Sequence, residues 1–266
     1  MSTIAAPVRD PGRVVMAAAD TIDVAGRNLR NLWRTPQAMI FATVQPVIFV
    51  LLFRYAFGGA IHVPGVSYVD YLMPGIFAQA VTFGAIGTAV GLSADMKSGL
   101  LTRFRTLPMA RIAVLGGRTL ADVARNVVVV AVMTGVGFAV GFRVHNGPAS
   151  LLAALGLVTV FAYALSWAFV ALGLRVSDPE AAQAAGVPFM FLLVFTSDAF
   201  VPLRSMPGWL QAIGAHQPVT ALVDAERSLT LGGPAQSHVI TSLAWSAGIL
   251  LVCAALAART YQHMDR

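Results

Sequence analysis

The sequence predicts an all-α polytopic membrane protein: six transmembrane helices, an amphipathic helix before the first, and short outer helices between the fifth and the sixth. Of the 266 residues, 57% are hydrophobic and 11% are charged, whereas a soluble domain averages about 25% charged residues. The apolar residues gather in runs that match the roughly 20 residues needed to cross a bilayer. The basic residues gather between those runs. No linker or repeat divides the chain, so residues 1–266 are predicted to form one transmembrane domain.

Residues 13–34 have the pattern of an amphipathic helix. Their apolar side chains recur in alternating steps of three and four residues, and arginine and aspartate occupy the opposite arc. We expect this helix to lie in the membrane interface, with Ile22, Leu29 and Leu32 in lipid and Trp33 at the headgroup level. The alternative is a helix packed on the protein itself.

Six apolar runs are candidate membrane spans. They fall at residues 35–58, 71–94, 119–142, 149–172, 181–201 and 239–258. No acidic or basic side chain is expected near mid-membrane, and this argues against an ion-driven carrier, which usually needs one. Glycines at four-residue spacing, Gly87/Gly91 and Gly137/Gly141, are expected to support ordinary close packing of helices.

The basic residues predict the orientation. If the six runs cross the membrane, fourteen of the 18 lysines and arginines fall on one side, together with both termini. The positive-inside rule places that side in the cytoplasm. The net charge of +6 therefore indicates orientation, and no nucleic-acid partner is expected. The polar start of the chain has no apolar signal core, so no cleaved signal peptide is expected.

Residues 95–112, between the second and third runs, combine an apolar knob with basic flanks. Leu101 and Phe104 can share one face of a short helix, with Arg103 and Arg105 beside them. Pro108 should end that helix near residue 106, after which a new helix can begin. The segment could be a docking element for a cytoplasmic partner, or its arginines could only hold the loop inside. The spacing alone favours neither.

Residues 202–234 are too apolar for a simple loop and too interrupted for a membrane span. Four prolines and four glycines divide them, and tryptophan, leucine, isoleucine and valine lie between. Short helices at the outer interface, or re-entrant into it, explain this composition best.

Enzyme chemistry is not expected. No histidine pair has metal-ligand spacing, and one cysteine, Cys253, excludes an intrachain disulfide framework. The phosphate-binding motif G-x-x-x-x-G-K-[ST] needs a glycine before its lysine, but Met96 precedes the one lysine, Lys97. The chain should therefore hold no metal or cofactor. If ATP drives it, a partner subunit binds ATP and Mg²⁺.

Four motifs together resemble the membrane subunit, or permease, of type-2 ATP-binding-cassette (ABC) exporters, and most closely the daunorubicin/doxorubicin-resistance branch. The resemblance covers nearly the whole chain. The motifs are Phe53-Arg-Tyr-Ala-Phe-Gly-Gly-Ala-Ile61, Tyr71-Leu-Met-Pro-Gly75, Gly99-Leu-Leu-Thr-Arg-Phe-Arg-Thr-Leu-Pro108, and Phe200-Val-Pro-Leu-Arg-Ser-Met-Pro-Gly-Trp-Leu210 followed by Gln217-Pro-Val-Thr220. The positions that carry the motifs outside the third are Phe57, Gly58, Gly59, Pro74, Gly75, Pro202, Pro207 and Pro218.

The resemblance implies a multi-pass protein of the bacterial plasma membrane that exports a hydrophobic or amphipathic compound: a drug, an antibiotic or a lipid. Two permease subunits, identical or paralogous, would pair, and each would dock on a separate ATP-binding cassette subunit. The residues expected to make that contact are Leu101, Arg103, Phe104, Arg105, Leu107 and Pro108. The export path would lie near spans one, two and five. The alternatives are a secondary, ion-coupled efflux carrier and a membrane scaffold that transports nothing.

Overall fold

The computed structural model describes residues 25–26, 36–59, 61, 63, 65–99, 111–176 and 178–263. These ranges are helices joined by short turns, and they contain no strand. The elements are α2 Pro36–Leu51, the π-helical turn η1 Leu52–Phe57, α3 Tyr68–Gly84, α4 Ile86–Lys97, α6 Arg111–Ala139, α7 Pro148–Gly173, α8 Pro179–Phe195, the 3₁₀ turn η2 Leu203–Ser205, α9 Gly208–Ala215, α10 Pro218–Leu231 and α11 Ala235–His263.

Four helical stretches in the described part are long and apolar enough to cross a membrane. They are Tyr68–Lys97, which joins α3 and α4, Leu115–Ala139, Pro148–Gly173 and Ala235–Tyr261. Two shorter apolar helices, Ala42–Phe57 and Pro179–Phe195, correspond to the first and fifth predicted spans. The predicted class, an all-helical polytopic membrane protein with short helices between the fifth and sixth spans, is confirmed.

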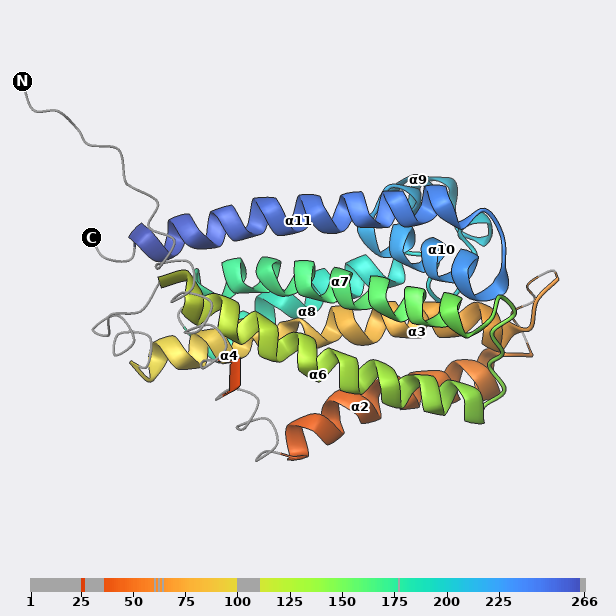
Figure 1. The fold of residues 1–266 in the computed structure, drawn as a ribbon, viewed down its shortest axis with the longest axis horizontal. Helices are drawn as coiled ribbons and strands as arrows, with labels where there is room; N and C mark the ends of the chain where they lie inside the picture. Colours follow the sequence, from red (N-terminus) through yellow and green to blue (C-terminus); the bar gives the residue numbers. More distant parts are fainter. Residues whose placement is uncertain are drawn as a thin grey trace, which may run out of the picture.

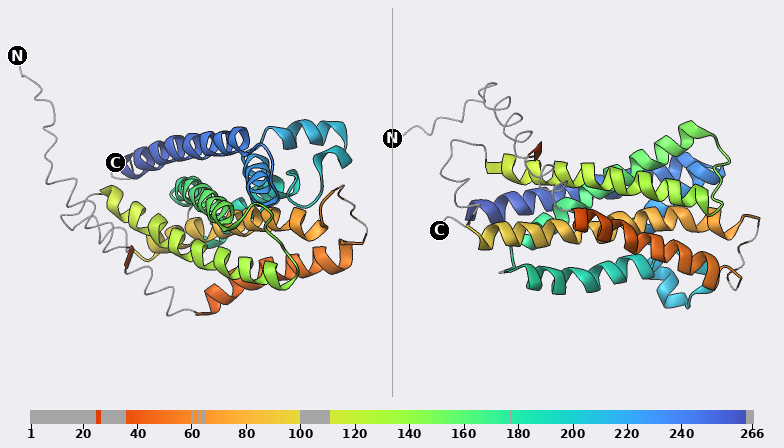
Figure 2. Two further views of the ribbon diagram at one scale, coloured as in Figure 1. Left: turned by 45° about the vertical axis from the view of Figure 1, so that its right-hand side comes forward. Right: turned by 90° about the horizontal axis from the view of Figure 1, so that it is seen from below.

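The long helices run side by side along one axis, so the bundle has two ends (Figure 1). At one end, called here the Tyr68 end, α3 begins and α6 ends. Helices α9 and α10 also lie at this end. At the other, the Lys97 end, α4 ends, α6 begins and α11 ends. Helix α11 packs on α7 and α10, and α4 packs on α7 and α8. Helix α2 packs on α3 and α6 and crosses them obliquely (Figure 2).

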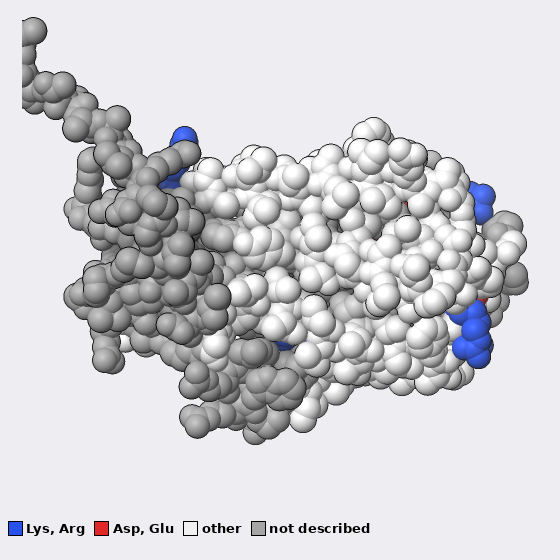
Figure 3. Space-filling model, in the orientation of Figure 1, with Lys and Arg blue, Asp and Glu red and all other residues white. Residues whose placement is uncertain are grey.

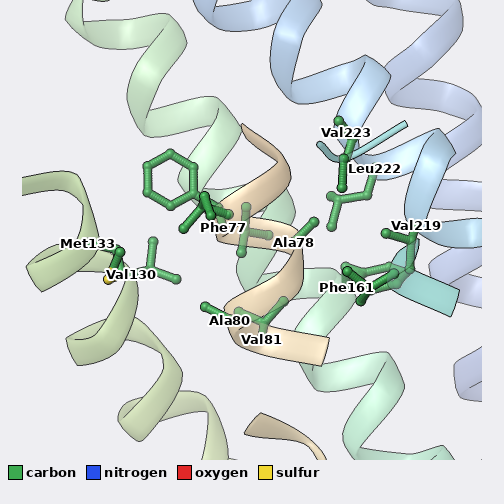
Figure 4. Close-up of a cluster of buried hydrophobic side chains, with 14 of the residues drawn as sticks. Phe77, Ala78, Ala80, Val81, Val130, Met133, Phe161, Val219, Leu222 and Val223 are labelled. Carbon is green, nitrogen blue, oxygen red and sulfur yellow. The ribbon is translucent and has the colours of Figure 1, made fainter. Parts of the chain in front are cut away.

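Helix α3 is the centre of the bundle. Most of its residues are apolar, and each residue from Tyr68 to Thr82 is buried, as expected of a helix enclosed by other helices. Figure 4 shows Phe77, Ala80 and Val81 between α6, which supplies Val130 and Met133, and the α7 and α10 side chains opposite.

The fifth predicted span, residues 181–201, is wrong at both ends. Helix α8 begins at Pro179, after the Asp178 side chain caps it by accepting from the Ala181 N–H at 2.8 Å. It ends at Phe195, where the Thr196 hydroxyl donates to the Leu192 carbonyl at 2.7 Å. Residues 196–201 form a turn outside the helix.

The visible flank of the described part carries almost no charge. Figure 3 shows lysine and arginine mainly at the edges of a broad surface without charged residues. Exposed leucine, isoleucine and phenylalanine on α2, α7, α8 and α11 make up much of the apolar exposure in the described residues. This is the surface expected where lipid replaces water.

Candidate functional site

Two groups of predicted site residues lie outside the described residues. The first is Leu101, Arg103, Phe104, Arg105, Leu107 and Pro108 of the predicted docking segment. The second is Ile22, Leu29, Leu32 and Trp33 of the predicted interfacial helix. The described part supplies the neighbours of the docking segment: α4 ends before it at Lys97, and α6 begins after it at Arg111.

The second motif meets the turn that leads into the fourth motif at the Tyr68 end, around one arginine of α10. The Arg227 guanidinium forms an ion pair with Asp198 and donates to the Asp198 carbonyl at 2.6 Å. It also stacks on the Tyr71 ring, 3.6 Å from its centroid, and donates to the Tyr71 carbonyl at 3.1 Å. The Tyr71 hydroxyl donates to the Asp198 carbonyl at 3.0 Å. We call Tyr71, Asp198 and Arg227 the Arg227 cluster. It ties α3, the turn after α8 and α10 together.

Gly75 allows α3 to approach the 196–201 turn closely enough for the Arg227 cluster to form. A Cβ at this position would overlap the Ala199 carbonyl oxygen and would lie 2.8 Å from the Ala199 Cα. Helix α3 therefore touches the 196–201 turn backbone to backbone. Gly214 of α9 is similar, because a Cβ there would collide with the Thr196 carbonyl oxygen. Two glycines thus admit the same turn between two helices.

The first motif also reaches this turn. Phe57 packs on Phe53 with tilted rings whose centroids lie 5.3 Å apart. Phe53 stacks on Phe200, with centroids 4.4 Å apart and 6° between the ring planes. Gly58 follows η1, where a Cβ would overlap the Arg54 carbonyl oxygen, and Gly59 completes the turn.

Three of the four prolines in the second and fourth motifs lie at the starts of helices or turns, and Pro74 does not. Pro202, Pro207 and Pro218 precede or open η2, α9 and α10, positions where the missing N–H costs nothing. Pro74 lies inside α3. Apart from Pro74, these prolines set the chain path rather than form a pocket.

Two acids at the Tyr68 end, outside the spanning helices, have altered protonation. Burial raises the pKa of Asp198 to about 7, and the Arg227 charge opposes this rise. Glu226 is fully buried, and neither of its carboxylate oxygens has a hydrogen-bond partner among the described residues. Burial therefore raises the pKa of Glu226 well above its usual value, which favours the neutral form.

A second charged network joins α4 and α6, and no sequence pattern predicted it. Arg118 forms an ion pair with Asp95, and Arg125 lies 3.3 Å from Asp122. The Thr88 hydroxyl donates to Asp122 at 2.6 Å. Asp122 and Arg125 both lie within the candidate span Leu115–Ala139, so this span carries an acid and a base that the apolar runs of the sequence did not predict. The two charges are tolerated because they pair.

The glycine row beside this network is not a helix-packing motif. A Cβ at Gly91 would collide with the Arg118 guanidinium, and one at Gly87 would lie 2.9 Å from Arg125 Nη1. The glycines therefore form a groove that holds arginine side chains of α6. The second pair also fails as a motif, because α6 ends at Ala139 and Gly141 lies in the following turn with φ +104°.

Arg125 also lies at a break in the central helix, between α3 and α4. Helix α3 ends at Gly84 and α4 begins at Ile86, so Ala85 separates them. The last carbonyls of a helix lack intrahelical donors, and Arg125 Nη2 donates to the Gly84 carbonyl at 2.7 Å.

A cavity of about 540 Å³ opens at this break. Five helices line it: α2, α3, α4, α6 and α8. Most of the lining is apolar, and its polar side chains are Gln45, Gln79, Arg125, Asn126 and Gln183. Gln79 and Asn126 are 1% and 2% exposed. Gln79 Oε1, Asn126 Nδ2 and Arg125 Nε are buried without hydrogen-bond partners among the described residues. The volume falls in the range of about 300–1,000 Å³ typical of small-molecule sites.

The comparisons with known proteins agree on one family. A sequence model of the ABC-2 type transporter matches residues 23–231. The daunorubicin resistance ABC transporter permease protein DrrB1 of Streptomyces coeruleorubidus is 34% identical, over 97% of this chain and 95% of that protein. The probable doxorubicin resistance ABC transporter permease protein DrrC of Mycobacterium tuberculosis is 32% identical over the same shares. The putative transport permease ycf38 of Pyropia yezoensis is 27% identical, over 76% of this chain and 71% of that protein.

Proposed function

The chain belongs to the ABC-2 type transporter family, and we propose that it is the permease subunit through which an amphipathic compound, such as a drug or an antibiotic, leaves a bacterial cell. The observation that carries this proposal is the similarity to drug-resistance permeases over 97% of the chain. The cavity between α2, α3 and α8 supports it, because these helices correspond to the predicted spans one, two and five.

A separate ATP-binding cassette subunit supplies the energy in this proposal. It docks on the segment that follows α4, with the Lys97 end and both termini in the cytoplasm. When the two ATP-binding subunits of the transporter close on ATP, the segment moves together with the helices on either side of it. The α4–α6 network supports this coupling. Arg118 and Asp122 of α6 bind Asp95 and Thr88 of α4, so the two helices that flank the segment move as one body.

A second permease subunit, identical or paralogous, completes the path along α2 and α8. Gln45 and Gln183 support this, because they line the cavity and are exposed on otherwise apolar helices. An amide against lipid acyl chains is unfavourable, whereas an amide against a partner helix or a water-filled path can be satisfied.

Charge reversal in the docking segment should uncouple transport from ATP. We expect Arg105→Glu to weaken co-purification with the ATP-binding subunit and to abolish export, because it opposes the charge on which docking depends. Phe104→Ala should do the same by removing the apolar knob. Export is measured as ATP-dependent loss of a fluorescent substrate from inverted vesicles or loaded cells, and docking is measured by pulldown.

The matched control is Arg259→Glu, which reverses an exposed charge near the same end of the bundle and should leave both readouts intact. Normal export and co-purification in both docking variants would contradict the docking role. Export that survives an inactive ATP-binding subunit but stops when the proton gradient collapses would replace this proposal with a secondary carrier.

A further inference from the structure

We infer that Glu226 holds a proton while α10 is seated in the bundle, and that loss of this proton as the pH rises loosens α10 at the Tyr68 end. Glu226 is in this sense a proton-binding site on which the packing of one short helix depends. This pH dependence is a property of the folded chain alone, so it does not rest on the proposed function.

Glu226 occupies the core face of α10. Val219, Leu222 and Val223 precede it by seven, four and three residues, so the four side chains share one face of the helix. All four are fully buried. Figure 4 shows the three apolar members in the buried cluster that also contains Phe161 of α7. An acid therefore stands where the rest of the face is apolar.

The carboxyl group of Glu226 has nothing that would hold a negative charge. Neither of its oxygens has a hydrogen-bond partner among the described residues. The Thr230 hydroxyl, one turn further on, donates to the Glu226 backbone carbonyl at 2.8 Å instead. A carboxylate in an apolar core without hydrogen bonds is so unfavourable that the group takes up a proton.

The neighbouring cation is engaged elsewhere. Arg227 follows Glu226 in the chain, but its guanidinium pairs with Asp198 and stacks on the Tyr71 ring. Its charge lowers the pKa of Glu226, and burial raises that pKa by more. The neutral form is therefore favoured despite an adjacent arginine.

The other elements around α10 supply no counter-ion either. Helix α10 packs on α3, α7, α9 and α11, and α7 and α9 carry no charged residue or histidine. Of the described groups, Arg227 is the one whose charge alters the pKa of Glu226. The remaining titratable and charged groups on α10, on these helices and on the adjoining turns are Asp224, Tyr68, Asp70, Tyr71, Tyr163, His238, Arg259, Tyr261, His263, Arg143, His145 and Asp198.

An acid that is neutral when buried makes the folded state less stable as the pH rises. Below the ordinary pKa of glutamate, about 4.3, Glu226 is protonated in the folded and the unfolded chain alike, so the full stability is present. Above it the unfolded chain releases the proton, whereas the folded chain keeps it until the pH passes the raised pKa. Across that window the folding equilibrium falls by up to about tenfold per pH unit.

The test compares the unaltered full chain with Glu226→Gln in lipid nanodiscs, from about pH 5 to pH 9. Glutamine is as neutral as the protonated acid and nearly the same shape, so α10 should stay seated at every pH. The readout is hydrogen exchange of the amides of Pro218–Leu231, compared at equal pH so that the intrinsic rate cancels. We expect equal exchange at the acidic end and at least about tenfold faster exchange in the unaltered chain at the alkaline end. A ratio that does not change with pH would overturn the inference.

The matched control is Glu180→Gln, because Glu180 is exposed in the first turn of α8. This variant should exchange like the unaltered chain at every pH. Burial also raises the pKa of Asp198 to about 7, but Asp198 is present in all three chains, so its effect cancels from the comparison.

Infrared spectroscopy at neutral pH reads the proton directly. The unaltered chain and Glu180→Gln should show the carbonyl band of a protonated carboxyl group, and Glu226→Gln should lack that band. An identical spectrum for Glu226→Gln would show that Glu226 is ionised in the folded chain, and the inference would be wrong.

A second variant serves if the extra N–H groups of glutamine disturb the core. Glu226→Leu matches the apolar face and carries no proton, so its α10 exchange should also show no dependence on Glu226 ionisation. If Glu226→Gln and Glu226→Leu both fail to fold at every pH, the fold requires a charged Glu226, and the inference is refuted.

Discussion

Gly75→Ala should lower the thermal midpoint of the detergent-solubilised chain by about 5 to 10 °C and reduce the amount of folded protein in the membrane. The new Cβ would meet the backbone of Ala199, including its Cα at 2.8 Å. Overpacking a filled site costs about 1–3 kcal/mol, and about 2–4 °C is lost per kcal/mol in a chain of this size. Backbone on both sides leaves no flexible side chain to move away.

The control for this experiment is Gly156→Ala. Gly156 also lies within a long apolar helix, α7, but a Cβ placed there would meet no described atom within 4 Å beyond its chain neighbours and the nearby backbone of its own helix. Since alanine favours a helix over glycine, this change should be neutral or slightly stabilising. Equal midpoints for the two variants would show that α3 and the 196–201 turn do not touch as described. The measurement is fluorescence-detected gel filtration after heating.

The second large effect is expected for Arg227→Met. Methionine keeps much of the length but leaves Asp198, whose side chain is 9% exposed, without its cation. Removing one partner of a buried ion pair costs about 3–5 kcal/mol because the other charge remains buried. The Tyr71 and Asp198 carbonyls also lose their donor. We expect most of this variant to be lost to aggregation or proteolysis during expression, with export lost in proportion.

Two further variants separate charge from geometry at this position. Arg227→Lys keeps the charge but loses the planar fork and the stacking on Tyr71, so it should recover part of the folded protein. Arg204→Met removes an exposed arginine at the same end and should express normally. If Arg227→Met accumulates and melts like the unaltered chain, the cluster does not stabilise the fold.

The class and most of the helices could be predicted from the sequence because membrane helices leave a long apolar run and turns leave prolines and glycines. The end of α8 could not. Residues 199–201 are as apolar as a span, and they leave the helix because Asp198 reaches Arg227 and Ala199 meets Gly75. Those contacts join positions far apart in the chain, and no local pattern records them.

The cavity was missed for a related reason. Arg118, Asp122 and Arg125 recur at steps of four and three, so they share a face of α6. The glycines at positions 84, 87 and 91 share a face of α3 and α4 in the same way. Each row is visible in the sequence, but the basic residues suggest orientation and the glycines suggest packing. Only their juxtaposition shows that one row holds the other and that amides are left unpaired beside them.

The Arg227 cluster can form only late in the synthesis of the chain. Its bonds join residues 127 and 156 positions apart, so α3 cannot be fastened until α10 has left the ribosome. At about 5–20 residues per second, Arg227 follows Tyr71 by roughly 8 to 30 s. For that interval the first spans sit in the membrane with their central helix unsecured. A chain that stops short of residue 227 would keep this unfinished state and be exposed to quality-control proteases.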